Sequence, residues 1–199
     1  MSTTKTTPTG AALQKPSTLK KFVLGFLAVL GLLIAAFLLV PAVLPPDLHV
    51  ERSIEIQRSP EDIYAVVSDL HQYKSWDPFS DEDPTIKTTL TGEGADTVYE
   101  WLGDQAGQGR IKIEKLEPPR SVNTRIQMLK PMEDEFVAGW ILTPAVDGTR
   151  ITWTFDQRVP YLKRWMGLAM DGMLGPAFDR GLNKLKTKME STPEAQPSA

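Results

Sequence analysis

Few residues in this sequence have the type and spacing that catalysis requires. There are two histidines, His49 and His71, and no cysteine. His71 lies two positions after Asp69, and a His–Asp pair can act as a general base. We expect this pair in a loop between two helices, where a solvated pair is the commoner interpretation. Glu100 lies between two aromatic residues on a predicted strand, so it faces away from them. The sequence predicts no catalytic residue.

The sequence offers little support for metal binding, thiol chemistry or nucleic acid binding. The absence of cysteine excludes disulfides, thiol catalysis and Cys-based metal sites. The acidic segment 80–84 (SDEDP) lacks the glycine and the distal glutamate of a calcium loop, so we interpret it as a solvated turn. Beyond residue 44 the chain is acidic without a basic cluster, which argues against nucleic acid as a partner. No metal site and no cofactor are expected, and no protein partner is identified.

Large apolar side chains are the better candidates for a functional site. They fall on one face of a predicted sheet, on one stripe of a predicted C-terminal helix, and at the junction between the two. Ordinary core packing is the alternative for each of them, although methionine also suits a pocket of variable shape. The candidate ligand-binding residues are Trp76, Trp101, Ile113, Phe136, Trp140, Trp153, Phe155, Met166, Met170 and Met173.

The elements that position these residues follow from hydropathy and turn signals. A helix is expected after Ser59, which suits an N-cap, with Pro60 at the first helical position. A second short helix is expected around residues 72–76, and a long helix over 161–190, where apolar residues recur at i+3 and i+4. Period-two alternation bounded by Gly, Pro and Asp turns predicts an antiparallel meander. Its strands are expected at 49–57, 86–91, 97–102, 109–117, 121–129, 135–143 and 149–158.

An uncharged run over residues 22–44 precedes this domain. As a helix it would be roughly 35 Å long, enough to cross the hydrocarbon core of a bilayer, about 30 Å thick. We predict a transmembrane helix at 22–44 between a disordered tail at 1–21 and a domain at 48–190, with a second disordered tail at 191–199. A cleaved signal peptide and a buried core helix are the alternatives.

Charge around the run predicts its orientation. The first 44 residues hold four lysines and no acidic residue. The positive-inside rule therefore favours a cytoplasmic N-terminus and an exported C-terminal domain. We expect a single-pass protein of the inner (plasma) membrane with its domain on the periplasmic or extracellular side.

The order strand, two helices, meander and long helix is that of the α+β helix-grip fold. The sequence resembles the START-like (SRPBCC) superfamily, and within it the bacterial polyketide cyclase/dehydrase-type family. The resemblance is carried by VERSI at 50–54, SPEDIY at 59–64, WDPF at 76–79, YEW at 99–101 and FDRGLNKLK at 178–186. It implies a curved sheet of about seven strands wrapped on the C-terminal helix, with an apolar cavity between them. The membrane anchor is an addition to the family's common pattern.

Two functions from different classes fit this resemblance. The preferred hypothesis is membrane-tethered binding of a hydrophobic small molecule or lipid in the cavity. The alternative is a cyclase or dehydratase that acts on a hydrophobic substrate there, which requires at least one titratable group inside the cavity. A domain for protein interaction with a vestigial cavity is a third interpretation.

Overall fold

The structure is a computed structural model that describes residues 18–191. The chain forms two compact units, with the boundary between Val43 and Leu44. The parts of the predicted tails at 1–17 and 192–199 lie outside the described residues.

The first unit contains one long apolar helix. α1 (Thr18–Leu39) begins before the predicted Phe22, and the short 3-10 helix η1 (Val40–Ala42) follows it. Residues Lys20–Ala42 are long and apolar enough to cross a membrane. A signal sequence would meet the same criteria, so the anchor and its orientation remain predictions.

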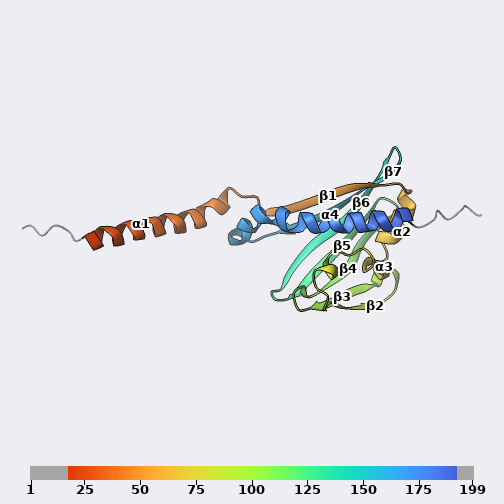
Figure 1. Ribbon diagram of the computed structural model, residues 1–199, viewed down its shortest axis with the longest axis horizontal. Coiled ribbons are helices and arrows are strands. Elements are labelled where there is room, and N and C mark those ends of the chain that lie inside the picture. Colours follow the sequence, from red (N-terminus) through yellow and green to blue (C-terminus); the bar gives the residue numbers. More distant parts are fainter. Residues whose placement is uncertain (1–17, 192–199) are drawn as a thin grey trace, which may run out of the picture. The chain divides into compact units, whose positions relative to one another are not determined.

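The second unit is built on one antiparallel sheet of seven strands (Figure 1). β2 to β7 form a meander of consecutive neighbours, and β1 pairs with β7 at the far edge. The predicted meander is confirmed, with strand ends shifted by a few residues. In spatial order the strands are β1 (Asp47–Ile56), β7 (Gly148–Arg158), β6 (Asp134–Ala145), β5 (Ser121–Lys130), β4 (Gly107–Glu117), β3 (Val98–Gly103) and β2 (Lys87–Thr91).

Two short helices follow β1. α2 (Pro60–Val67) is capped as predicted, because the Ser59 hydroxyl accepts the backbone N–H of Asp62 at 3.2 Å. α3 (Leu70–Tyr73) begins and ends earlier than the helix predicted over 72–76. The helix starts earlier because Asp69, which we expected in a loop, is its N-cap.

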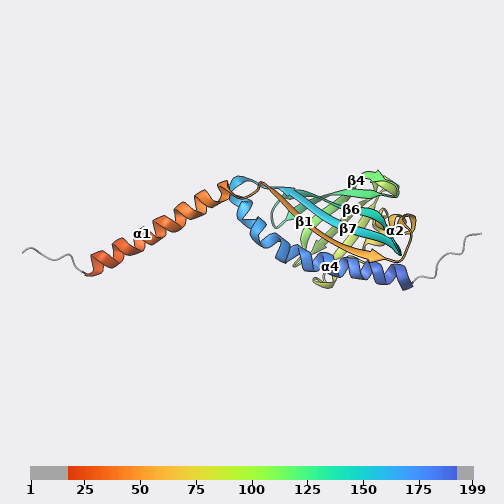
Figure 2. The ribbon, with the colours of Figure 1, turned by 90° about the horizontal axis from the view of Figure 1, so that it is seen from above.

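The C-terminal segment is a helix with a different beginning from the predicted one. Its first six residues form the 3-10 helix η4 (Tyr161–Met166), and α4 (Gly167–Ser191) continues from it. α4 runs alongside β1 and is visibly bent (Figure 2). Pro176 lies inside the helix and removes one backbone hydrogen bond, a common cause of such bends.

The core lies between the apolar face of the sheet and the helices. α2, α3 and the C-terminal half of α4 pack on part of that face. This arrangement is the α+β helix-grip fold predicted from the sequence. Its most buried apolar residues include Ile63, Val67, Leu70 and Trp76 from the segment with the short helices, Val122, Trp140 and Ile151 from the sheet, and Leu182 and Leu185 from α4.

Candidate functional site: an aromatic cavity

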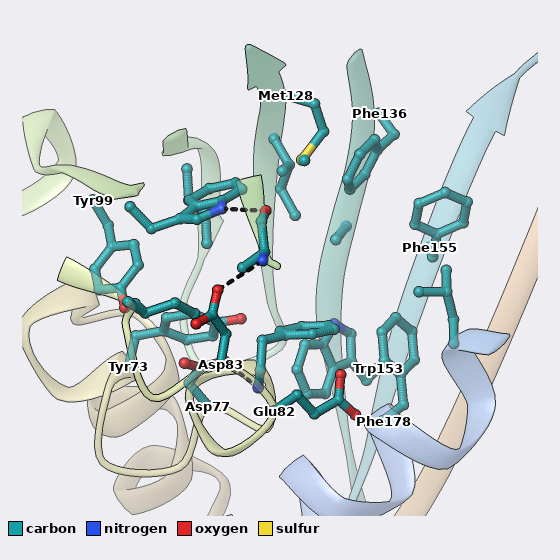
Figure 3. Close-up of a pocket in the computed structure, with 18 of the residues that line it drawn as sticks. Tyr73, Asp77, Glu82, Asp83, Tyr99, Met128, Phe136, Trp153, Phe155 and Phe178 are labelled. Carbon is teal, nitrogen blue, oxygen red and sulfur yellow. Dashed lines mark hydrogen bonds between the residues drawn. The ribbon is translucent and has the colours of Figure 1, made fainter. Parts of the chain in front are cut away.

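A cavity of about 460 Å³ lies among the sheet, the loop over residues 77–86 and α4 (Figure 3). Small-molecule sites commonly occupy about 300–1,000 Å³. Most of the wall is aromatic or aliphatic, and carboxylates and backbone amides lie along one side. The wall is formed by Tyr73, Asp77, Phe79, Glu82, Asp83, Ile86, Tyr99, Trp101, Gln105, Ala106, Ile111, Ile126, Met128, Phe136, Ala138, Trp153, Phe155, Leu174 and Phe178.

Four of the ten predicted site residues line this cavity. They are Trp101, Phe136, Trp153 and Phe155. Phe136 and Phe155 are neighbours across the sheet, with ring centroids 4.8 Å apart. Trp153 stacks on Phe178 of α4 with ring centroids 4.4 Å apart. The wall therefore presents several flat apolar surfaces that are fixed by contacts with one another.

The orientation of Trp101 is set by the strand beside it. Its indole N–H donates to the backbone carbonyl of Ala106 at 3.2 Å. Gly109 faces Trp101 in the register of β3 and β4, and a Cβ at that position would overlap the indole ring. A glycine in this strand thus makes room for the indole that closes one side of the cavity.

Four other predicted site residues belong to the packed core instead. Trp76 is 1% exposed, and its ring lies 5.4 Å from that of Trp140 and 5.5 Å from that of Trp153. Trp76 thus follows the alternative of ordinary core packing and does not line the cavity. Ile113, Trp140 and Met170 are also buried in the core and do not line the cavity.

The remaining two predictions, Met166 and Met173, are on the surface. Met166 is 42% exposed and Met173 is 71% exposed. Met166 lies in a 3-10 helix, whose three residues per turn break the spacing that predicted an inward position. In α4 the inward positions are Met170, Leu174 and Phe178, spaced by four residues. Met173 lies one position off this stripe and faces outward.

The acidic segment near the cavity is exposed at Asp81 and Glu82, as expected of a solvated turn, but not at Asp83. Asp83 is 2% exposed. Its carboxylate accepts hydrogen bonds from the Thr85 hydroxyl at 2.5 Å and from the backbone N–H groups of Gln105 and Ala106 at 2.7 and 2.9 Å. These donors, the Thr85 hydroxyl first, lower the pKa of Asp83 to about 2. Asp83 therefore ties the 77–86 loop to the β3–β4 hairpin as a carboxylate.

Asp77 and Glu82 are also occupied by partners. The Asp77 carboxylate accepts the backbone N–H groups of Phe79 and Ser80 at 2.9 and 3.1 Å. Glu82 pairs with Arg180 of α4. These interactions help to hold the loop in place.

Two phenols are among the hydrogen-bond donors of the cavity wall. Burial raises the pKa of Tyr73 well above its ordinary value and raises that of Tyr99 to about 12. Both side chains are therefore protonated at neutral pH. Their rings meet edge to face with centroids 5.3 Å apart. Neither tyrosine was among the predicted site residues, although the position of Tyr99 on the strand, two residues before Trp101, placed it on the same face.

The candidate His–Asp pair lies outside this cavity. Asp69 is the N-cap of α3 and accepts the backbone N–H of His71 at 2.9 Å. The His71 ring nitrogen Nδ1 lies 3.1 Å from the same carboxylate oxygen. Both side chains are about half exposed. The pair therefore has a structural role at the start of a helix, rather than the loop position expected from the sequence.

Comparison with solved structures supports the fold. One similar structure is the Zhui aromatase/cyclase from a Streptomyces species, with a TM-score of 0.54 and 16% identity over 77% of this chain and 99% of that one. Another is a protein from Mesorhizobium loti, with a TM-score of 0.54 and 16% identity over 72% of this chain and 98% of that one. At such identities the likeness concerns the fold alone. No match was found among the curated proteins.

The sequence of the second unit also matches a family profile. The match extends over residues 47–190, which is nearly the whole helix-grip domain, and the family is described as polyketide cyclase/dehydrase and lipid transport. The resemblance seen in the sequence motifs is thereby confirmed. The chain belongs to the polyketide cyclase/dehydrase and lipid transport family.

Proposed function

We propose that this protein binds an apolar small molecule or lipid in the aromatic cavity, while α1 anchors it in a membrane. The cavity is the observation that carries the proposal. Its volume of about 460 Å³ suits a ligand with a ring system or a folded acyl chain. Flat aromatic walls favour such a ligand because they offer large contact area with few rotatable bonds.

The carboxylates of the cavity favour binding over acid–base catalysis. A general acid or base must reach the proton that it transfers. Asp77, Glu82 and Asp83 are each held by donors from the protein, and the low pKa of Asp83 keeps it ionised. Tyr73 and Tyr99 can donate a hydrogen bond to one oxygen of a ligand. The cavity is thus equipped to orient an apolar molecule that carries a single polar group.

Native mass spectrometry of the full chain released from detergent micelles tests this proposal. We expect a bound mass that survives gentle activation and is identified by extraction into organic solvent. Ile126→Trp occupies part of the cavity and should reduce the bound mass. Its control is Lys112→Trp, which adds the same side chain to the exposed outer face of the sheet. A chain that carries no bound mass and has no affinity for apolar probes would contradict the proposal.

Enzymatic activity is the second candidate, and the two phenols favour it. The cyclase or dehydratase alternative requires a titratable group in the cavity, and Tyr73 and Tyr99 both line it. A phenol can protonate or polarise a carbonyl during ring closure or loss of water. If the bound molecule is converted to a product, Tyr73→Phe should slow the conversion at least tenfold and weaken binding less, since one hydrogen bond contributes about 1 kcal/mol. Equal rates for the two proteins would remove Tyr73 from the mechanism.

The proposed orientation has a separate test. The four lysines before residue 22 favour a cytoplasmic N-terminus. Alkaline phosphatase fused after residue 60 should then be active, because it folds only when exported. An inactive fusion, with an active cytoplasmic reporter at the same site, would reverse the orientation and leave the binding proposal intact.

A further inference from the structure

Four exposed apolar side chains lie close together in η4 and at the start of α4. Tyr161, Leu162 and Met166 of η4 and Leu168 of α4 lie within eight consecutive residues and are 41%, 52%, 42% and 67% exposed. We call these four residues the exit patch. Large apolar side chains grouped in this way commonly mark an interaction surface.

The chain itself holds the exit patch close to the end of the apolar run. The Arg164 guanidinium donates to the carbonyl of Leu44 at 3.3 Å, and the backbone N–H of Val159 donates to the carbonyl of Pro46 at 2.9 Å. The candidate membrane span ends at Ala42. Two residues of chain reach about 7 Å at most. Whatever orientation the domain adopts, η4 cannot move far from the membrane surface.

The register of the sheet puts the cavity at this same end of the second unit. β1 begins and β7 ends here, and so do the β3–β4 and β5–β6 hairpins, because neighbouring strands are antiparallel. The β3–β4 hairpin contributes Gln105 and Ala106 to the cavity wall, and Met128 and Phe136 flank the β5–β6 hairpin. The Lys163 ammonium of η4 lies 3.4 Å from Asp134 at the start of β6. The exit patch and the cavity therefore share one end of the domain.

We propose that the exit patch docks on the bilayer and turns the cavity end of the domain toward it. The occupant is the lipid interface itself, because a surface held within a few residues of a span meets headgroups before any other partner. Tyr161 suits this zone, since its ring is apolar and its hydroxyl polar. Charges at this end are of both signs, since Lys163 pairs with Asp134 and Arg164 is the next residue of η4. Docking is thus driven by apolar insertion rather than by attraction to anionic lipid.

The proposal deepens the proposed function and rests on its membrane anchor. It assigns the ligand to molecules that are dissolved in the bilayer. An apolar molecule that leaves the membrane beside the exit patch reaches the cavity wall with little exposure to water. The exchange would occur at one membrane, without diffusion of the protein.

Single-cysteine labelling of the full chain tests the docking, because the protein has no cysteine of its own. Leu162→Cys and Leu168→Cys are each labelled with an environment-sensitive fluorophore and reconstituted in phosphatidylcholine vesicles that contain doxyl-labelled lipid. The matched control is Val146→Cys, in the turn between β6 and β7 at the other end of the sheet, where the side chain is 99% exposed. We expect quenching at 162 and 168 to exceed that at 146 at least threefold, with little change at high salt.

The outcomes separate the docking from the anchor and from ligand binding. Equal, weak quenching at the three sites in protein that floats with the vesicles would overturn the docking and leave the anchor standing. Protein that does not float would overturn both. Contact between labels on two copies without lipid quenching would assign the patch to self-association and overturn the docking. The double variant Leu162→Glu/Leu168→Glu changes the exit patch and no residue of the cavity wall. We therefore expect native mass spectrometry of this variant to show the same bound mass as the wild type.

Discussion

The two halves of the sheet's apolar face differ in what covers them. At one end α2, α3 and the C-terminal part of α4 press side chains such as Ile63 and Leu182 onto the sheet, and both are almost fully buried. At the other end α4 bends and the 77–86 loop arches over the strands, and a cavity of about 460 Å³ remains. One continuous apolar surface thus serves as a solid core in one half and as a binding wall in the other.

Trp153 lies at the boundary between the halves. Its ring centroid lies 5.5 Å from that of Trp76, which belongs to the packed half. Its ring also stacks on Phe178, which lines the cavity as Trp153 does. Gly181 lets α4 approach closely here, because a Cβ would overlap the Trp153 ring. Through Trp153 the packed half of the face contacts the wall of the cavity.

Truncation of an aromatic side chain should destabilise the protein much more in the packed half than in the cavity half. Trp140→Ala removes a ring that is 2% exposed and should lower the free energy of unfolding by about 3–5 kcal/mol. Phe136→Ala in the cavity wall should lower it by about 1–2 kcal/mol, since part of the ring already faces open space. Urea unfolding, monitored by circular dichroism with all proteins in the same detergent, measures the free energy of unfolding of both variants. Equal losses would erase the distinction between the halves.

A smaller effect concerns the acid sensitivity of the cavity side. The folded pKa of Asp83 is lowered from 3.8 to about 2, so its contribution to stability is complete above pH of about 4 and is lost as the pH falls through about 2. Asp83→Asn should be less stable at neutral pH and should lose part of the wild-type decline between pH 4 and 2. Stability curves at several pH values check this, and parallel curves for the two proteins would contradict it.

The smallest expected effect concerns the tie between the loop and α4. Lys184 donates to the Asp81 carboxylate at 2.7 Å and to the Asp77 carbonyl at 3.0 Å. Exposed ion pairs contribute only about 0.2–1 kcal/mol, so Lys184→Ala should change stability little. It should instead speed the release of a bound apolar probe, because the loop forms part of the cavity wall. Lys186→Ala, farther along the same helix, is the control, and equal release rates for the two variants would show that the tie does not gate the cavity.

The contrast between the halves also marks how far the sequence could predict the site. Period-two alternation identified the apolar face, and it placed Trp101, Phe136, Trp153 and Phe155 on it. Alternation says nothing of what lies above each residue. Trp140 shares the pattern of Phe136 and differs only because other side chains cover it. The division into core and cavity is therefore a tertiary property that no local signal contains.

Other misses have equally local causes. The segment 80–84 lacks the glycine and the distal glutamate of a calcium loop, which favours a solvated turn. Two of the donors to Asp83 nevertheless lie in a hairpin about twenty positions later. Met166 was assigned inward by a helical period that its 3-10 segment does not follow. The contacts of Asp83 with the hairpin and the 3-10 geometry at Met166 cannot be read from the few neighbouring residues on which each prediction was based.

The most direct test of the account is a volume series in the cavity wall. Ile126→Ala, wild type, Ile126→Phe and Ile126→Trp are compared by the amount of apolar ligand that co-purifies with each full chain, and the same residues are placed at Lys112 on the outer face. We expect retention to fall stepwise with side-chain volume from Ile to Trp at 126, by at least tenfold in all, and to stay level at 112. Retention that is independent of volume at 126 would contradict a ligand site in the cavity.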